Sequence, residues 1–501
     1  MPTCKEINAL IAQLNRELAA ATNQLAGAVS AADRARIQQL IDALETELAG
    51  LRGDWLAQGC DRPVKPAIPV LAQPGKNIQV TYDSNPNNDR SESVLISNPI
   101  NPLNMVGASK RFTDPVEYQF SLAAYATLDG GATWTESLLP PVAGADFTSD
   151  PIVTFDDLGK AYLSGLVWTY PVPPPPIRPK SLGMAAYTST DGGLTWSAPD
   201  FFYQGYADKP AIAGDTTPAS PHHGNVYAAW DGDRPDDHHE IQFARTTDRG
   251  ATWIGAGPVA TGPPPGTVVA HGLFPSVSVT GDGTVVVFFM AAGQPPSVDC
   301  IRSTDGGDTF TAAATVATLV AELPIQLPGG KFRTETIPTS CCGPGRIVTV
   351  AWPEFRNNVA EIYYQQSHDA GSSWNGPTNG RLLTPTAAGQ HNFAPQLAAT
   401  PAGDIGCAFY QFGPRAGGAP PDLIDVLLAV SRDTGADFRQ RITITDRPWD
   451  PTVDAPLGGG FIGDYFGLAA GSTGWFPFWT DTRTGIQELF TCHAYELIRG
   501  A

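Results

Sequence analysis

The stretch STDGGLTW at residues 189–196 decides the fold, because similar stretches occur five more times along the chain. Each copy has an aspartate in its third position, a glycine in its fifth and an aromatic residue in its eighth. The six aspartates are Asp129, Asp191, Asp248, Asp305, Asp369 and Asp433. They lie 57 to 64 residues apart, which is a suitable length for one four-stranded blade of a β-propeller.

The chemistry of the repeat predicts a hairpin turn. The carboxylate and the nearby Ser or Thr hydroxyl can accept hydrogen bonds from local backbone N–H groups, while glycine permits positive φ. The aromatic ring should pack between blades. These stretches resemble the Asp-box, or BNR repeat, of sialidases and their many non-sialidase relatives. The resemblance covers roughly residues 77–499 and implies that the boxes are structural: they would join the third and fourth strands of a blade, opposite the binding face.

Strand counting favours seven blades, with a six-bladed propeller as the alternative. Residues 463–497 contain three strand-like segments without a box, and residues 77–82 could supply the fourth strand and close the ring. Closure would remove the open sheet edge that invites aggregation. We therefore expect an all-β propeller over residues 77–501. The 52 Gly and 46 Pro suit such a turn-rich protein.

The first 60 residues have helical periodicity instead. Apolar residues recur at helical spacing in two runs, and Thr3 with Glu6 and Ser30 with Asp33 are typical of helix N-termini. We predict a helical hairpin over residues 1–60 and a proline-rich linker over residues 61–76. The hairpin could serve self-association, docking or attachment, or could simply pack on the propeller.

The seven cysteines are too sparse for a disulfide framework. Cys4 and Cys60 bracket the hairpin, and a disulfide could join them at its open end. The neighbours Cys341 and Cys342 are expected to be two free thiols, with a strained disulfide as the alternative. Three more, in predicted strands, should be buried and inert: Cys300, Cys407 and Cys492.

The formal net charge of −19 argues against nucleic acid and anionic membranes as partners, because both require a basic footprint. No apolar stretch is long enough to span a membrane, and the first residues do not form a signal peptide. We nevertheless suspect an extracellular or cell-surface location. No cofactor is expected, and cysteine spacing gives no zinc site. The histidines in residues 236–240 could ligate a metal but are more typical of a solvated loop.

Residues around the starts of the innermost strands should share the binding face at the channel mouth. The aligned starts are Ser93, Asp150, Lys209, Phe274, Ile337, Ala394 and Asp464. Around them stand Glu92, Asp150, Asp208, Lys209, His271, Glu335, His391, Asn392, Asp464 and Tyr465. Such a ring could bind sugar hydroxyls or a cation, including a structural Ca²⁺. Alternatively, several of these residues cap strand ends or pair with one another.

A second repeat places an acid and an arginine together in three blades. It reads WDGDR at residues 230–234, WPEFR at 352–356 and WTDTR at 479–483. Three arginines around one mouth, Arg234, Arg356 and Arg483, could hold an acidic sugar by its carboxylate. The competing interpretation is an acid–arginine ion pair that braces each loop, and the recurrence of the motif favours it.

Sialidases bind the substrate carboxylate with three arginines and use a Tyr nucleophile, an assisting Glu and an Asp acid/base. On that resemblance, Tyr465 would be the nucleophile, with Glu335 and Asp150 as base and acid. The Arg-Ile-Pro signature of the family is missing, since the matching strand reads SVLI at residues 93–96. Fold alone does not establish activity.

The leading hypothesis is therefore a propeller that binds a glycan or another surface ligand at its mouth. A glycoside hydrolase of the exo-sialidase type is the second hypothesis, and a purely structural or assembly protein is the third. The proline-rich residues 171–179 could form a wall or docking ridge on the same face.

Overall fold

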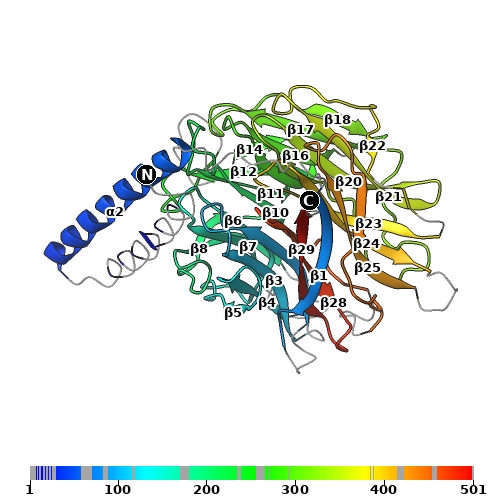
Figure 1. Ribbon diagram of the computed structural model, residues 1–501, viewed down its shortest axis with the longest axis horizontal. Helices are drawn as coiled ribbons and strands as arrows, with labels where there is room; N and C mark the ends of the chain where they lie inside the picture. Colours follow the sequence, from blue (N-terminus) through cyan, green and yellow to red (C-terminus); the bar gives the residue numbers. More distant parts are fainter. Residues whose placement is uncertain are drawn as a thin grey trace.

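The computed structural model shows strands arranged in sheets around an axis, with helix α2 (Ala31–Ala57) standing out to one side (Figure 1). It describes residues 30–57 and several helical positions from Ile7 to Gln24. It also describes residues 70–498 except 83–88, 115–118, 170–179, 234–238, 256–265, 270, 292, 384, 387–388, 415–421 and 454–459.

Seven antiparallel sheets form seven blades, so the seven-bladed prediction is confirmed over the six-bladed alternative. Blades 1 and 2 contain β2 (Arg90–Ser97), β3 (Met105–Asp114), β4 (Gln119–Thr127), β5 (Thr135–Leu138), β6 (Phe147–Phe155), β7 (Ala161–Thr169), β8 (Lys180–Ser189) and β9 (Asp200–Gln204). Blades 3 and 4 contain β10 (Asp208–Gly214), β11 (Val226–Asp233), β12 (His239–Thr246), β13 (Ile254–Gly255), the additional β14 (Gly266–Val269), β15 (Leu273–Val279), β16 (Val285–Ala291), β17 (Ser297–Ser303) and β18 (Ala314–Thr318).

Blades 5 and 6 contain β19 (Thr339–Cys342), β20 (Val348–Arg356), β21 (Val359–Ser367), β22 (Arg381–Leu382), β23 (His391–Ala399), β24 (Ile405–Gly413), β25 (Leu423–Ser431) and β26 (Gln440–Thr443). Blade 7 contains β27 (Gly467–Gly471), β28 (Gly474–Asp481), β29 (Glu488–Ile498) and β1 (Val70–Gln79). Within each blade, neighbouring strands follow one another along the chain, except where β1 joins β29 and where β14 joins β12.

Strand β1 closes the ring from the other end of the sequence. It pairs antiparallel with β29 from Val70 opposite Ile498 to Gln79 opposite Phe490, with a bulge between Pro74 and Asn77. Strand β1 begins before residue 77, so residues 70–76 belong to blade 7. The predicted linker was wrong for this part, and residues 61–69 lie outside the described residues.

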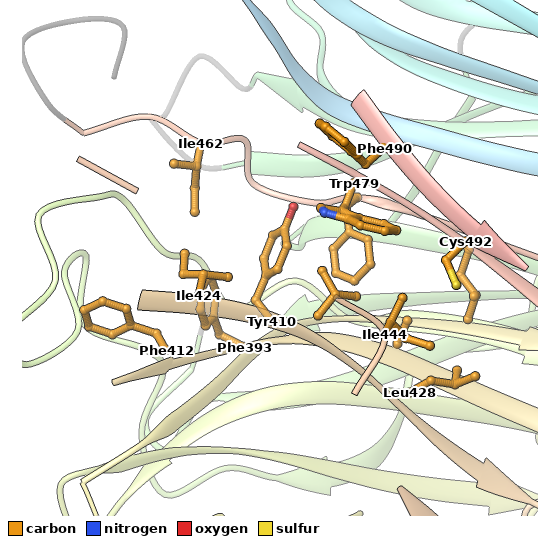
Figure 2. Packing of buried hydrophobic residues seen from close by; sticks show 14 of the residues in the cluster. Phe393, Tyr410, Phe412, Ile424, Leu428, Ile444, Ile462, Trp479, Phe490 and Cys492 are labelled. Atoms are coloured by element: carbon orange, nitrogen blue, oxygen red, sulfur yellow. The ribbon is translucent and has the colours of Figure 1, made fainter. Parts of the chain in front are cut away.

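A large apolar cluster fills the seam between blades 6 and 7. Figure 2 shows Phe393 and Tyr410 of blade 6 close to Trp479 and Phe490 of blade 7. Ala72 of β1 belongs to the same cluster. Burial of such apolar surface contributes about 25 cal/mol per Å² to folding, so packing holds this seam, while the β1–β29 ladder closes the ring within blade 7.

All six Asp-boxes lie between the third and fourth strands of their blades, as predicted. At Asp305, Oδ1 accepts hydrogen bonds from the Ser303 hydroxyl (2.7 Å) and the Thr309 N–H (2.9 Å). The other five boxes repeat this pattern. Gly307 has φ 86°, and a Cβ there would lie 2.9 Å from the Phe243 ring, which explains the glycine in the fifth position.

The aromatic residue of each box packs against the preceding blade. Five ring pairs show this directly: Trp134 with Phe478, Trp253 with Phe202, Phe310 with Phe243, Trp374 with Phe288 and Phe438 with Tyr364. Blade 7 has no box because its third and fourth strands, β29 and β1, come from opposite ends of the chain. There is consequently no turn between them for a box to make.

The N-terminal region is helical where it is described. Ser30 caps α2: its hydroxyl accepts from the Asp33 N–H (3.0 Å) and donates to the Asp33 carboxylate (2.6 Å), as the sequence predicted. The buried stripe of α2 packs with the helical residues Ile7, Leu14 and Ala21, and Ile100 of blade 1 packs against this cluster. The hairpin therefore contacts the propeller through the β2–β3 turn.

The described cysteines are free thiols, including Cys341 and Cys342. Cys300, Cys407 and Cys492 are buried in strands, as predicted. Cys4 and Cys60 lie outside the described residues, so their disulfide stays a prediction.

Candidate functional site

In five blades the backbone is strained at the start of the innermost strand. Five non-glycine residues there have positive φ: Glu92 (54°), Asp150 (51°), Lys209 (44°), Phe274 (56°) and Ala394 (48°). Each lies in a break of the strand pairing, and such bulges redirect side chains. Positive φ costs a non-glycine residue about 1 kcal/mol or more. Because this strain recurs at the same position in five blades, it marks the face at which the innermost strands begin as the candidate functional face.

The register of these breaks corrects one alignment. In blade 1 the break spans Ser91 to Val94, and in blade 2 it spans Ser149 to Ile152. The residue equivalent to Asp150 is therefore Glu92, not Ser93.

Four of the five strained residues, all except Ala394, line one cavity of about 500 Å³. The strands of a blade alternate in direction, so this mouth lies on the face opposite the Asp-boxes. Its walls are Glu92, Lys110, Phe120, Ser149, Asp150, Trp168, Asp208, Lys209, Asp231, His239, Leu273, Phe274, Arg333 and Glu335. Of the residues predicted around the mouth, Glu92, Asp150, Asp208, Lys209 and Glu335 are thus brought together.

Asp464 binds two of the cations that line this cavity. It accepts from Arg333 through both carboxylate oxygens (Nε to Oδ1, 2.8 Å) and from the Lys209 ammonium. Lys209 Nζ also lies 3.7 Å from Asp150 Oδ2, and Arg333 Nε lies 3.9 Å from Glu335 Oε1. Burial alone would raise the pKa of Asp464, but Lys209 and Arg333 outweigh it and hold the pKa at about 2.

Glu92 is a buried acid with an unsatisfied oxygen. It is 1% exposed, and its Oε2 has no hydrogen-bond partner among the described residues. Burial raises its pKa to about 8, with a further increase from Asp150. Lys110 Nζ lies 3.8 Å from Oε2 and also over the rings of Phe120 and Phe461, 4.2 and 4.9 Å from their centroids.

A second pair of acids faces the cavity from blade 3. Asp208 and Asp231 are directly opposite each other on β10 and β11. Asp231 Oδ1 accepts from the Phe274 N–H (2.8 Å), and Asp208 Oδ1 accepts from the Lys209 N–H (2.9 Å). Burial and the neighbouring Asp208 raise the pKa of Asp231 well above its usual range, and burial also raises that of Asp208. Burial thus favours the protonated form of both carboxyl groups.

The described arginines of the second repeat bind acids of their own blades. Arg356 binds Glu354 through Nε (2.7 Å) and Nη2 (2.8 Å), and Glu354 also accepts from the Trp352 indole (3.3 Å). Neither Arg356 nor Arg483 lines the cavity. The ion-pair interpretation therefore describes both residues in this structure, and their role as a ligand clamp stays a prediction. Arg234 lies outside the described residues.

Blade 7 repeats this brace, whereas blade 3 departs from it. Arg483 binds Asp481 through Nε (2.8 Å) and Nη2 (2.6 Å). In blade 3, Gly232 takes the place of the braced acid, and Asp231 lies one position earlier. Since side chains alternate along a strand, this shift turns the acid from the brace toward the cavity.

Tyr465 is not arranged as an activated nucleophile. Its hydroxyl donates to the Pro151 carbonyl (3.5 Å), and it is not among the residues that line the cavity. Burial, followed by Glu92, Asp150 and other nearby acids, raises its pKa well above the usual range. Nucleophilic activation requires the opposite shift or an adjacent base.

The predicted histidines do not line the cavity either. His391 is buried and its Nδ1 accepts from the Ala360 N–H (3.2 Å), while burial lowers its pKa. Asn392 donates to the Thr386 hydroxyl (3.0 Å), so both residues serve blade contacts. His271 is exposed beside the start of β15.

Sequence reasoning missed several residues of the cavity, above all Lys110 and Arg333. Lys110 lies in β3 directly before Arg111, after five small or apolar residues, so nothing in the sequence singled it out. Arg333 comes from the irregular segment between β18 and β19, which has no periodicity to place it. The rings of Phe120 and Trp168 were missed because aromatic residues in strands usually belong to the core.

Within the described residues, no group of three or more His, Cys, Asp or Glu is arranged to hold a metal ion. The proposed Ca²⁺ stays a prediction, and most of the acid–histidine loop at residues 236–240 lies outside the description. The described helices include none with the length and apolar character to cross a membrane.

Comparison with known proteins identifies the repeat. The model of the BNR/Asp-box repeat family matches residues 187–198. No curated protein matches the sequence significantly.

Solved structures resemble the chain in part. A protein of unknown function from Dyadobacter fermentans has 16% identity and a TM-score of 0.43, over 71% of this chain and 98% of that one. The leech intramolecular trans-sialidase has 12% identity and a TM-score of 0.43, over 67% of each chain. The NanB sialidase of Streptococcus pneumoniae has 12% identity and a TM-score of 0.45, over 68% of each chain. Likeness of this degree says nothing about what the cavity binds. With six boxes at equivalent corners of a closed ring, the chain is an Asp-box (BNR-repeat) β-propeller of seven blades.

Proposed function

We propose that this propeller binds a saccharide at its channel mouth. The observation that carries the proposal is the cavity of about 500 Å³, in which carboxyl groups stand beside the rings of Phe120 and Trp168. Its volume falls in the range of small-molecule sites. Carboxyl groups accept hydrogen bonds from sugar hydroxyls, while aromatic faces cover the apolar face of a sugar ring.

The state of the arginines supports binding over sialidase chemistry. A carboxylate clamp requires guanidinium groups that are open to the ligand, yet Arg356 and Arg483 are each bound bidentately to a buried acid. The hydroxyl of Tyr465, the candidate nucleophile, donates a hydrogen bond to a backbone carbonyl.

A binding experiment tests the proposal. A glycan array followed by calorimetry should give at least one saccharide ligand, and Trp168→Ala and Asp150→Asn should each weaken its binding about ten-fold or more. Tyr82→Ala is the matched control, because Tyr82 is an aromatic residue that is 79% exposed and outside this cavity. Saccharide binding unchanged in both cavity variants would contradict the proposal.

Hydrolysis of a glycoside is the second candidate, favoured by one observation. Acids in different protonation states meet here, since burial raises the pKa of Glu92 to about 8 while Asp464 is held at about 2. Glycosidases divide acid and base roles between two such carboxyl groups. Turnover of a fluorogenic sialoside that disappears in Tyr465→Phe would establish the exo-sialidase mechanism and overturn simple binding.

We further propose that the hairpin attaches or assembles the propeller, in keeping with an extracellular or cell-surface location. Its contact with Ile100 lies at a β2–β3 turn, on the Asp-box face, so a hairpin-bound partner would leave the cavity accessible. An oligomer that is lost on removal of residues 1–60, together with an empty glycan array, would instead favour a purely structural protein.

A further inference from the structure

The cavity contains more acids than cations. Its walls include five carboxyl residues: Glu92, Asp150, Asp208, Asp231 and Glu335. Three cations stand among them: Lys110, Lys209 and Arg333. Burial raises the pKa of Glu92 to about 8 and that of Asp231 well above its usual range, so the wall offers carboxyl groups more than net negative charge. The chain as a whole has a net charge of −19, and a long-range field of this sign draws cations toward the protein and repels anions.

The three cations already have acidic partners within the protein. Lys209 lies between Asp464 and Asp150, and Arg333 is bound bidentately to Asp464. Lys110 lies beside Glu92 and over two aromatic rings. An anionic ligand would have to compete with these carboxylates for each cation.

The acids, by contrast, retain acceptor capacity toward the cavity. Glu92 Oε2 is buried without a hydrogen-bond partner, and its side chain lines the cavity wall. Across the mouth, Asp231 and Asp208 oppose each other in the strand register, and Lys209 is the cation that acts on both. A buried unpaired acceptor costs free energy that a donor on a ligand would recover.

We propose that the saccharide of the proposed function carries a free, protonated amino group, which binds between Glu92 of blade 1 and the Asp208–Asp231 pair of blade 3. The ligand class is thus a basic amino sugar, not an acidic one. An ammonium group has three donors and no acceptor, so it suits the unsatisfied Glu92 Oε2 together with the carboxyl groups opposite it. The inference rests on the proposed function and narrows it.

Proton release gives this inference a distinctive signature. The charged groups that face Glu92 are Asp150, Asp464, Lys110, Lys209 and Arg333, and with burial they leave its pKa at about 8. The carboxyl is therefore protonated in the free protein at about pH 6.5. A bound ammonium favours the ionised form, so binding should expel a proton into the buffer.

The probes are glucosamine, galactosamine and mannosamine, each compared with its N-acetyl form and its parent hexose. Calorimetry at about pH 6.5, where an ordinary amine is charged, should show binding of a free amine about ten-fold or more tighter than both counterparts. The measured heat should differ between buffers of different ionisation enthalpy. Glu92→Gln should abolish most of that difference, and Asp208→Asn should weaken amine binding further than hexose binding.

Asp437→Asn is the matched control, because it removes one negative charge at an exposed position outside the cavity. An N-acetyl form or a hexose that binds as tightly as its amine would overturn the inference and leave the proposed function intact. Spermidine is an amine without a sugar ring and tests the opposite case. If spermidine binds in a Glu92-dependent way and no sugar binds, the amine site is supported and the proposed saccharide function is contradicted. Absence of binding by every amine probe contradicts the inference, and the glycan array decides separately whether the propeller binds any saccharide.

Discussion

Carboxyl groups in the Asp-box turns and carboxyl groups in the cavity on the opposite face have pKa values shifted in opposite directions. At the corners, hydrogen bonds from Thr309 and Ser303 outweigh partial burial and hold the pKa of Asp305 at about 2. Asp369 is held at about 2 in the same manner by Ser373 and Ser367. In the cavity, burial and neighbouring acids raise the pKa of Glu92 to about 8 and that of Asp231 well above its usual range.

The backbone shows this contrast only in part. The fifth position of every box is a glycine with positive φ, and the cavity face places Glu92, Asp150 and Lys209 in that region of φ. Three boxes also have a non-glycine residue there at their fourth position: Arg249, Ala370 and Thr434. The clearer difference is in hydrogen bonding, because the box aspartates accept several hydrogen bonds while Glu92 Oε2 accepts none. Such division is expected when one face maintains the fold and the other binds a ligand.

Removal of the brace in blade 5 should have the largest effect. Arg356→Ala leaves Glu354 buried with its guanidinium partner gone, and should lower the free energy of unfolding by about 3 kcal/mol. Denaturant unfolding measures the loss, and ligand binding at the cavity should persist. The exposed Arg439→Ala is the control. Loss of binding at unchanged stability would restore the clamp interpretation.

Disruption of a single corner should cost somewhat less. Asp305→Ala removes the acceptor of Ser303 and Thr309 and should lower the free energy of unfolding by about 2 kcal/mol. Thr304→Ala, in the same turn at an exposed position, serves as the control. A corner variant that melts like the control would show that the hydrogen-bonded turn contributes little.

In the cavity, replacement of a buried carboxyl group by a neutral side chain should raise the stability of the protein. The pKa of Glu92 is raised on folding from 4.5 to about 8, so its stabilising contribution is present below pH 4.5 and is lost as pH rises through about 8. Glu92→Gln should therefore stabilise the protein by about 1 kcal/mol or more near pH 8. Thermal melts from pH 5 to pH 9 should diverge as pH rises, and parallel curves would refute this origin.

The smallest effect should come from relief of backbone strain. Ala394 has φ 48° and does not line the cavity, so Ala394→Gly should raise stability by a few tenths of a kcal/mol up to about 1 kcal/mol. Ala399→Gly, in the same strand, should lower it by about 0.5–1 kcal/mol. Melting temperatures that fall equally in both variants would argue against strain at Ala394.

The contrast between the faces also explains what the sequence could predict. Local chemistry builds a box, so each of the six aspartates and the Ser30–Asp33 cap could be placed from neighbouring residues alone. Ring closure followed from a long-range argument about edges, and it located the closing strand but not its start at Val70.

The cavity depends on contacts between distant segments. Alignment of the strand starts placed Glu92, Asp150, Asp208, Lys209 and Glu335 near one mouth, but it could not supply Arg333 from an irregular segment. Motif similarity also misled: WDGDR resembles WPEFR and WTDTR, yet a shift of the acid by one position turns Asp231 toward the cavity. Strand alternation was the signal that would have separated them.

The pairing of β1 with β29 has a consequence for biosynthesis. The ribosome makes the first strand of the propeller before any other, and its partner, residues 488–498, after all the others. During most of translation β1 is thus an unpaired edge, open to association with nascent chains nearby. Pro74, Gly75 and Lys76 interrupt it at the bulge, and proline and lysine are the residues that discourage such pairing. The irregularity in the closing strand thereby protects the chain while it waits for its partner.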